Sequence, residues 1–263
     1  MLDGAPELAK QGANANELII PMMSMDGLAD YSRNGGYVQG GVTMTNETVK
    51  CNFDRGRRFD VDVMDDLETA GLAFGRLSAQ FIRDKVVPEL DAFRFASYCG
   101  ISGVTKKVET LANGVATVAA LSAAVTAMDD EEVTATGRYL FITPTLLQGI
   151  NDMDTTKSKK VLEGFERVIK VPQRRFYTAI KQLSGKTGEE AGGYTKAAGA
   201  ANINFSIIQK DALIQYTKHA APKIIAPENN PDADAYVFGY RMVGIAKAYK
   251  NMLSGMYFSH DQA

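Results

Sequence analysis

Tryptophan is absent from this sequence of 263 residues, and cysteine and histidine occur only twice each. Cys51 and Cys99 lie far apart and form no Cys-x-x-Cys pair, so they predict neither a disulfide framework nor a zinc site. Any histidine-dependent catalysis would have to use His219 or His260, and no Gly-x-Ser-x-Gly motif precedes either of them. These shortages argue against a metalloenzyme and against a Ser-His-Asp hydrolase.

The sequence also lacks an excess of either charge, because 29 basic residues stand against 31 acidic residues and the formal net charge is −2. Proteins that bind nucleic acid tightly need a basic surface, so this balance of charge argues against a dedicated nucleic-acid binder. No apolar run approaches the ~20 residues of a membrane helix, and the first residues lack the pattern of a signal peptide. We therefore expect a soluble protein that does not associate with membranes.

Glycine and apolar residues are plentiful, with 24 glycines and a hydrophobic content of 45%. Residues 1–16 predict an N-terminal arm with little to bury. Glu17–Met25 is a strand candidate, in which Pro21 favours an edge or irregular strand. Alternating apolar and polar residues at 42–49 and 58–63 predict two strands beside a glycine-rich stretch. Together these segments indicate a projecting β-hairpin arm, which would need another surface because an isolated hairpin is marginal in water.

Residues 65–98 carry the clearest helical signal in the sequence. Apolar residues, Phe81 among them, recur every three or four positions, as one face of a helix requires. Asp65 and Glu68 have the spacing of a capping box, which predicts that the helix starts at Asp65. Pro88 predicts a kink, because proline removes one backbone hydrogen bond. At 1.5 Å per residue the helix would be ~50 Å long, which is typical of a structural spine.

Shorter helices and strands alternate after residue 100. Ala116–Met128 predicts a helix, and residues 211–219 predict another one that Asp211 would cap. The polar, glycine-rich stretch 184–200 predicts a surface loop. Strands are expected at residues 138–142, 168–171, 202–209 and 236–259. The whole pattern indicates an α+β protein.

From about Tyr31 to Cys99 the sequence contains DYSRNGGYVQGGVT, DRGRRFDVDVMDD and ETAGLAFGRLSAQFIRDKVVPELDAFRFA. This region resembles the loop, hairpin and spine of tailed-bacteriophage major capsid proteins. The resemblance resumes in GRYLFITP, INFSIIQKDALIQYTKH and NPDADAYVFGYR, and so touches most of the chain after residue 17. It implies the Hong Kong 97-like phage capsid fold, an α+β architecture with an E-loop hairpin, a long spine helix in a peripheral P domain, and an axial A domain.

The resemblance implies the following division of the chain: an N-terminal arm (1–16), a P-domain part (17–100) with the E-loop (28–58) and spine helix (65–98), an A domain (101–220), and C-terminal strands that return to the body (221–263). It implies a protein that assembles with itself into pentamers and hexamers. These would form an icosahedral phage head that encloses double-stranded DNA without sequence-specific binding. Portal and scaffolding proteins would be further partners, and assembly would take place in the host bacterial cytoplasm. No enzymatic activity, cofactor or metal is expected.

The same resemblance implies that side chains of the E-loop and spine make contacts between subunits. The expected contact residues are Tyr31, Arg33, Tyr37, Arg55, Arg57, Arg58, Glu68 and Asp84. For the three hairpin arginines, pairing with carboxylates is favoured over DNA binding, because the guanidinium fork suits a carboxylate. Glu68, Asp84 or Glu89 of a neighbouring spine are the expected acidic partners.

Two motifs invite other functions. Ser184–Gly188 resembles a phosphate-binding loop, but the position of its first glycine is Ile180. An acidic cluster could attract Ca²⁺ or Mg²⁺, although Met64 occupies the fifth position of an EF-hand spacing. Surface and capping roles are favoured for its members, Asp60, Asp62, Asp65 and Asp66.

Two alternative functions stay open. The first is an encapsulin-type compartment, which has the same fold and encloses a cargo enzyme. The second is a soluble α+β enzyme that uses a nucleotide bound at the 184–188 loop, and it would be a monomer or small oligomer.

Overall fold

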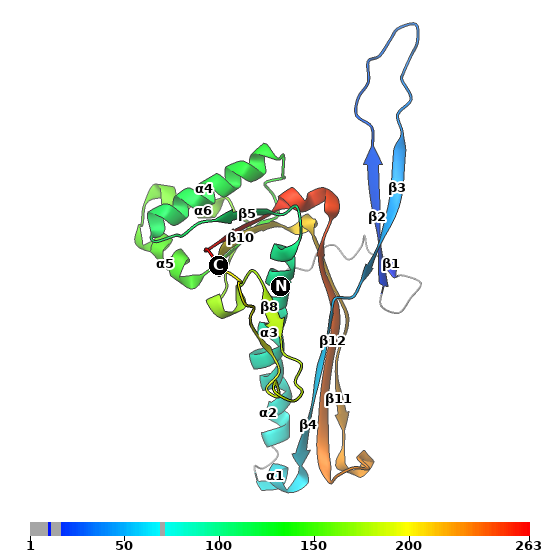
Figure 1. Cartoon of the computed structure of the whole chain (residues 1–263), viewed down its shortest axis with the longest axis vertical. Coiled ribbons are helices and arrows are strands. Elements are labelled where there is room, and N and C mark those ends of the chain that lie inside the picture. The colour runs from blue at the N-terminus through cyan, green and yellow to red at the C-terminus, as the bar shows by residue number, and fades with distance from the viewer. Residues whose placement is uncertain (1–9, 12–16, 69–71) are drawn as a thin grey trace.

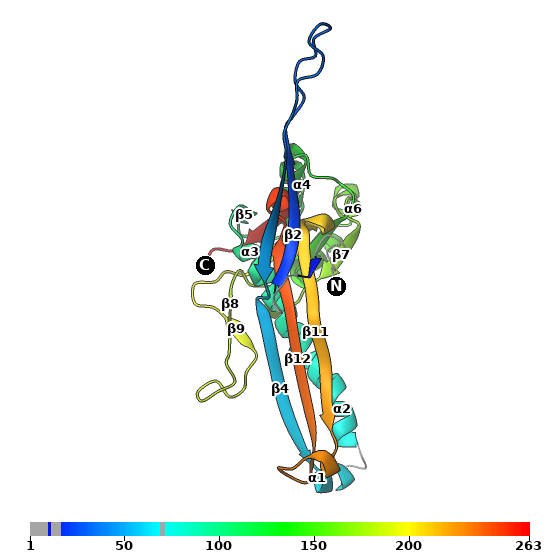
Figure 2. The same ribbon diagram turned by 90° about the vertical axis from the view of Figure 1, so that its right-hand side faces the viewer.

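The computed structural model describes the backbone of residues 10–11, 17–68 and 72–263, and the side chains of residues 17–65 and 76–263. Figure 1 shows three parts: a lobe of helices and sheet, a long blade below it, and a hairpin arm that projects away from both. Figure 2 shows the hairpin arm and the blade nearly in one line.

The lobe is built on a five-stranded sheet in the order β5-β13-β10-β6-β7. The strands are β5 (Thr105–Val108), β6 (Arg138–Ile142), β7 (Arg167–Lys170), β10 (Ile203–Gln209) and β13 (Met256–His260). β10 runs antiparallel to both of its neighbours, whereas β5 and β7 pair in parallel at the two edges. Every residue of β6 and β10 is buried, because both faces of the sheet are covered. The strands expected at 138–142, 168–171 and 202–209 are therefore confirmed.

Three helices cover one face of the lobe sheet, namely α4 (Gly114–Asp130), α5 (Pro144–Asp152) and α6 (Thr156–Glu163). Asn113 caps α4 by accepting a hydrogen bond of 2.9 Å from the Ala116 amide. A Cβ at Gly114 would lie 2.1 Å from the Gly149 carbonyl oxygen, so only glycine permits this approach of α4 to α5. The helix predicted at 116–128 is confirmed as the larger part of α4.

The blade consists of three antiparallel strands packed on a helical spine. The strands are β11 (Leu213–Ile225), β12 (Ala235–Ala248) and β4 (Phe53–Asp62), with β12 in the centre. The spine is α1 (Val63–Glu68), α2 (Leu72–Phe81), the π-helical turn η2 (Ile82–Val86) and α3 (Val87–Gly100). The Phe81 ring lies 4.8 Å from the Phe59 ring and 6.3 Å from the Phe238 ring, measured between centroids. This packing fixes the spine on the sheet.

The start of the spine differs from the expected one. α1 begins at Val63, and the Asp62 carboxylate accepts a hydrogen bond of 2.9 Å from the Met64 amide. The capping role predicted for Asp65 is therefore wrong, because β4 runs directly into the helix and Asp62 takes that position. The disturbance predicted at Pro88 takes the form of a π-helical turn, in which the Val87 amide donates to the Ile82 carbonyl. Pro88 then lies in the first turn of α3, where its missing N–H costs little.

The helix predicted at 211–219 is wrong. A short 3₁₀ turn, η4 (Lys210–Ala212), is capped by the Gln209 side chain and leads into β11. β11 pairs with β12 along its whole length, with a register shift between Thr217 and His219. Residue 220, the expected end of the A domain, lies within this strand. Another 3₁₀ turn, η6 (Lys250–Gly255), connects β12 to β13.

The hairpin arm consists of β2 (Glu17–Met25) and β3 (Val42–Lys50), and β1 (Lys10–Gln11) pairs with the base of β2. The strand predicted at 58–63 was expected to belong to this arm, and that expectation is wrong because β4 pairs with β12 in the blade. Apolar side chains of β2 and β3 pack on β11 and β12 at the base of the arm. They are Leu18, Ile20 and Val49 against Ile214 and Ile245.

Replacing Phe81 with Asp is expected to lower the free energy of unfolding by about 3 kcal/mol or more, because a charge replaces the ring that joins spine and sheet. Urea unfolding of unassembled subunits, followed by circular dichroism, measures the loss. Ala79→Asp is the matched control, since Ala79 is exposed on the same helix. Equal stability of the two variants would contradict the packing described here.

Candidate subunit-contact surfaces

The hairpin arm exposes apolar side chains that nothing in the described chain covers. Thirteen large hydrophobic residues are exposed among the described side chains, and eight of them lie on the arm: Met23, Met25, Leu28, Tyr31, Tyr37, Val38, Val42 and Met44. Tyr37 is 91% exposed and Tyr31 is 61% exposed, while their rings contact each other at 5.0 Å. Exposed apolar surfaces of this kind are typical of contact sites.

The tip of the arm, residues 26–41, holds its shape through local hydrogen bonds. The Gly41 amide donates to the Asp26 carboxylate at 2.7 Å, and the Asp26 amide donates to the Gly41 carbonyl at 3.2 Å. Further out, the Gly36 amide donates to the Ser32 carbonyl at 2.7 Å. Arg33, another expected contact residue, is exposed beside this turn.

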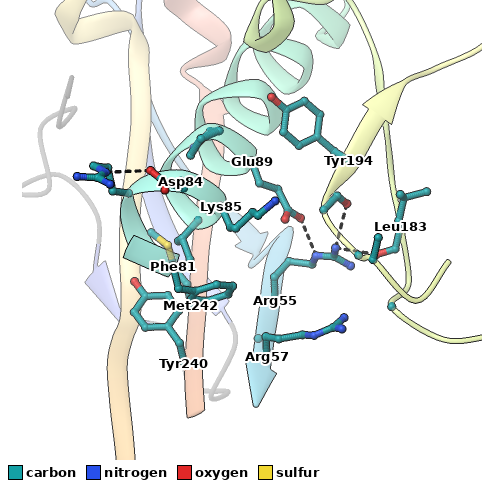
Figure 3. A pocket seen from close by; sticks show the side chains of 18 of the residues that line it. Arg55, Arg57, Phe81, Asp84, Lys85, Glu89, Leu183, Tyr194, Tyr240 and Met242 are labelled. Carbon is teal, nitrogen blue, oxygen red and sulfur yellow. Dashed lines mark hydrogen bonds and ion pairs between the residues drawn. The ribbon is translucent and has the colours of Figure 1, made fainter. Parts of the chain in front are cut away.

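Arg55 bonds to groups of its own chain. Its Nε atom donates to Glu89 of the spine at 2.8 Å, and its Nη2 atom donates to the carbonyls of Leu183 at 2.7 Å and Gly193 at 3.2 Å. Arg57 donates to the Glu190 carbonyl at 2.8 Å. Figure 3 shows the Arg55 guanidinium between the spine and loop 183–193. The two arginines therefore hold this loop against the blade.

Two further contact candidates, Arg58 and Asp84, lie at the surface in ion pairs with close neighbours in sequence. Arg58 pairs with Asp60 at 2.8 Å, and this pair raises the pKa of the guanidinium. Arg83 pairs with Asp84 at 2.9 Å and lowers the pKa of the Asp84 carboxyl group. The side chain of Glu68 lies outside the described residues. Glu89 was expected to pair with a hairpin arginine of a neighbouring copy, but the structure pairs it with Arg55 of the same chain, because β4 packs on the spine.

Loop 183–193 connects two short strands, β8 (Ile180–Gln182) and β9 (Tyr194–Lys196). A phosphate-binding loop leads from a strand into a helix whose N-terminus faces the anion, and no helix follows here. Glu189 closes the loop internally by accepting from the Ser184 amide at 2.7 Å and from Lys181 at 2.6 Å. The structure therefore supports the surface-loop prediction, with β9 as a short strand inside it.

A cleft of about 1150 Å³ opens between β4, the spine and the segment 183–196. Aromatic and aliphatic side chains form its floor: Phe53, Phe59, Leu77, Phe81, Val86, Tyr240 and Met242. Arginine and lysine side chains surround this floor. The cleft thus combines an apolar floor with a basic rim.

Asp60, Asp62 and Cys99, which the sequence offered as metal-ligating or thiol candidates, have structural surroundings. No three His, Cys, Asp or Glu side chains among them are grouped so as to hold a metal ion. Asp60 bonds to Arg58, and Asp62 caps α1. Burial raises the pKa of the Cys99 thiol to about 11, so that it stays protonated and unreactive at neutral pH. In the same parts of the chain, no helix is long and apolar enough to cross a bilayer.

No protein-family model and no curated protein matches the sequence. Solved structures do match the fold. A structure from Gordonia phage Cozz has a TM-score of 0.63 at 11% identity and is matched over 98% of this chain and 86% of the other. The capsid structure of cyanophage P-SCSP1u has a TM-score of 0.61 at 13% identity, over 96% and 85%.

A virus-like particle from Pyrococcus furiosus has a TM-score of 0.58 at 8% identity and is matched over 97% of this chain and 92% of the other. These matches span nearly the whole chain. The chain therefore has the α+β fold of phage capsid proteins, as its resemblance to that family implied.

Replacing Arg55 with Ala is expected to lower the free energy of unfolding by about 2 kcal/mol, because Glu89 keeps a largely buried charge and two loop carbonyls lose their donor. Arg58→Ala is the control. Its pair with Asp60 is half exposed and screened by water, so a much smaller loss than that of Arg55→Ala is expected. Urea unfolding compares the two variants, and an equal loss in both would show that Arg55 does not hold the loop.

Lowering the pH is expected to destabilise loop 183–193 by protonating the Glu189 carboxylate. The bonds from Lys181 and Ser184 lower the pKa of the Glu189 carboxyl group from 4.5 to about 2. A lowered pKa stabilises the folded loop above pH 4.5, and this contribution is lost as the pH falls from 4.5 towards 2. Exchange of the Ser184 amide, relative to its intrinsic rate, should accelerate across that window. Glu189→Gln should remove the step, and a step that persists in this variant would belong to another group.

Proposed function

We propose that this chain is the major capsid protein of a tailed bacteriophage. Its copies associate into pentamers and hexamers, which close into an icosahedral head around double-stranded DNA. The role is structural and involves no catalysis. The fold supports this function, because the matched structures include the capsid of a cyanophage.

The exposed apolar surface of the hairpin arm carries the proposal. Burying one large apolar side chain contributes about 1.5–3 kcal/mol, and the arm offers eight of them to a neighbour. Among the described residues, the arm packs on the rest of its own chain at its base, so its outer half would gain this stability through association. Since every copy both offers an arm and receives one, the contact repeats around a ring and across a shell.

The balance of charge is consistent with a shell that encloses DNA without binding its phosphates tightly. With a net charge of −2 the chain has no general basic excess to bind phosphates. A portal and a scaffolding protein are the further partners that this function requires. The protein would be located in the phage head after assembly in the host cytoplasm.

An encapsulin-type compartment is the second candidate, because the fold also matches the virus-like particle from Pyrococcus furiosus. The contents of purified particles separate the two functions. A phage head protects double-stranded DNA from added nuclease, whereas a cargo compartment contains a second protein and no genome.

Shortening the hairpin arm is expected to leave a folded subunit that cannot build stable particles. Residues 27–40 are replaced by Asn-Gly, which joins Asp26 to Gly41 through a two-residue turn and keeps their backbone hydrogen bond. Electron microscopy and mass photometry measure particle formation, and circular dichroism checks the fold.

The control for this deletion is Tyr31→Ser with Tyr37→Ser, which keeps the length of the arm but removes the exposed rings. We expect it to weaken assembly less than the deletion does. If the shortened chain forms particles with the yield and stability of the unaltered protein, the arm does not join subunits.

A further inference from the structure

Among the described residues, the cleft beside the spine carries more basic than acidic side chains. Seven basic side chains line it, against the two acids Asp84 and Glu89: Arg55, Arg57, Arg83, Lys85, Arg174, Arg175 and Lys196. Three of the seven pair with acids of the same chain, namely Arg55 with Glu89, Arg83 with Asp84, and Arg175 with Asp91. The other four form no ion pair with any described carboxylate: Arg57, Lys85, Arg174 and Lys196.

The floor below these cations is apolar, and this limits what the cleft can take. Phe59, Phe81 and Met242 favour a protein segment with an apolar side chain over the polar backbone of a nucleic acid. The volume of about 1150 Å³ suits one turn of a polypeptide. The expected occupant is therefore an acidic, protruding segment that also exposes an apolar residue.

The same chain carries such a segment at the far end of the blade, which we call the acidic pole (residues 60–65 and 228–234). Its two parts are joined by a hydrogen bond of 3.2 Å from the Val63 amide to the Asp234 carbonyl. Five acidic residues are exposed in the acidic pole: Asp62, Asp65, Glu228, Asp232 and Asp234. No lysine or arginine occurs in residues 59–75 or 224–240, and Arg58, just before the first range, pairs with Asp60 and interacts electrostatically with Asp232. Met64, 64% exposed, lies among these acids.

We propose that the acidic pole of one copy docks in the cleft of a second copy. The carboxylates of the pole would meet the four cations that pair with no described carboxylate of their own chain, and Met64 would reach the apolar floor. A chain cannot fill its own cleft in this way, because β4 runs from the cleft to the pole as one strand paired with β12. Since pole and cleft are different surfaces, the contact joins copies head to tail. It requires two copies and does not require a closed shell.

Site-directed disulfide cross-linking of the full chain tests the contact directly. All variants carry Cys51→Ser, and Cys99 is buried. Copies with Met64→Cys are mixed with differently tagged copies that carry Lys85→Cys, and are oxidised gently. A disulfide-linked pair of the two tags is expected. The control partner is Lys157→Cys, exposed on α6, which should give about tenfold less product, as expected where no charged interface forms.

Reversing the charges of the cleft and of the pole distinguishes a loss of docking from a loss of folding. Lys85→Glu with Arg174→Glu should lower the association of cleft and pole about tenfold, and so should Asp232→Lys with Asp234→Lys. Mixing copies with the reversed cleft and copies with the reversed pole should restore association to within about twofold of the unaltered protein, because the pairing is again complementary. For this comparison the association is measured by mass photometry at several protein concentrations.

The outcomes distinguish this proposal from the proposed function. Cross-linking at the control level in copies that form normal particles would overturn the docking and leave the shell function standing. Strong cross-linking without closed particles would support the docking and count against the shell. If the reversed cleft instead loses binding to double-stranded DNA and no cross-link forms, the cleft binds nucleic acid and the docking is wrong.

Discussion

Phe81 of the spine contacts rings from two strands, Phe59 of β4 and Phe238 of β12, and through them helix and sheet become one blade. A sheet of three strands needs a further element to complete a core, and along the blade the spine supplies it. The helix in turn carries Glu89 to the place where Arg55 and the carbonyls of loop 183–193 meet it. The base of the hairpin arm packs on the upper ends of β11 and β12. Loop 183–193 and the base of the hairpin arm therefore both rest on the blade.

The elements that could be predicted from sequence are those whose local composition alone favours one secondary structure. β6 and β10 are short apolar runs, and such runs become buried strands in a sheet that is covered on both faces. α4 has an alanine-rich composition and an Asn113 cap, which favour a helix in any context. The fold class followed from the resemblance in the segment from the E-loop to the spine.

The errors have a common physical cause, which is pairing between residues distant in sequence. Residues 211–219 have an acceptable helical pattern, but β12 offers them a complete ladder of hydrogen bonds, and tertiary pairing overrides local preference. β4 likewise pairs with β12, more than 170 residues away, and not with β3. The hydrogen bonds of Arg55 to Leu183 and Gly193 belong to the same class, because no local spacing places these groups together.

The order of strands in the lobe has a consequence for how the chain can fold during synthesis. β13 is the last strand in sequence, yet it lies inside the sheet, between β10 and β5. Until residues 256–260 have left the ribosome, β5 has no neighbour and one edge of β10 is open. The lobe therefore closes only after translation has passed this strand, although the blade strands precede it in sequence. A nascent chain therefore cannot complete the lobe sheet before residues 256–260 have been synthesised.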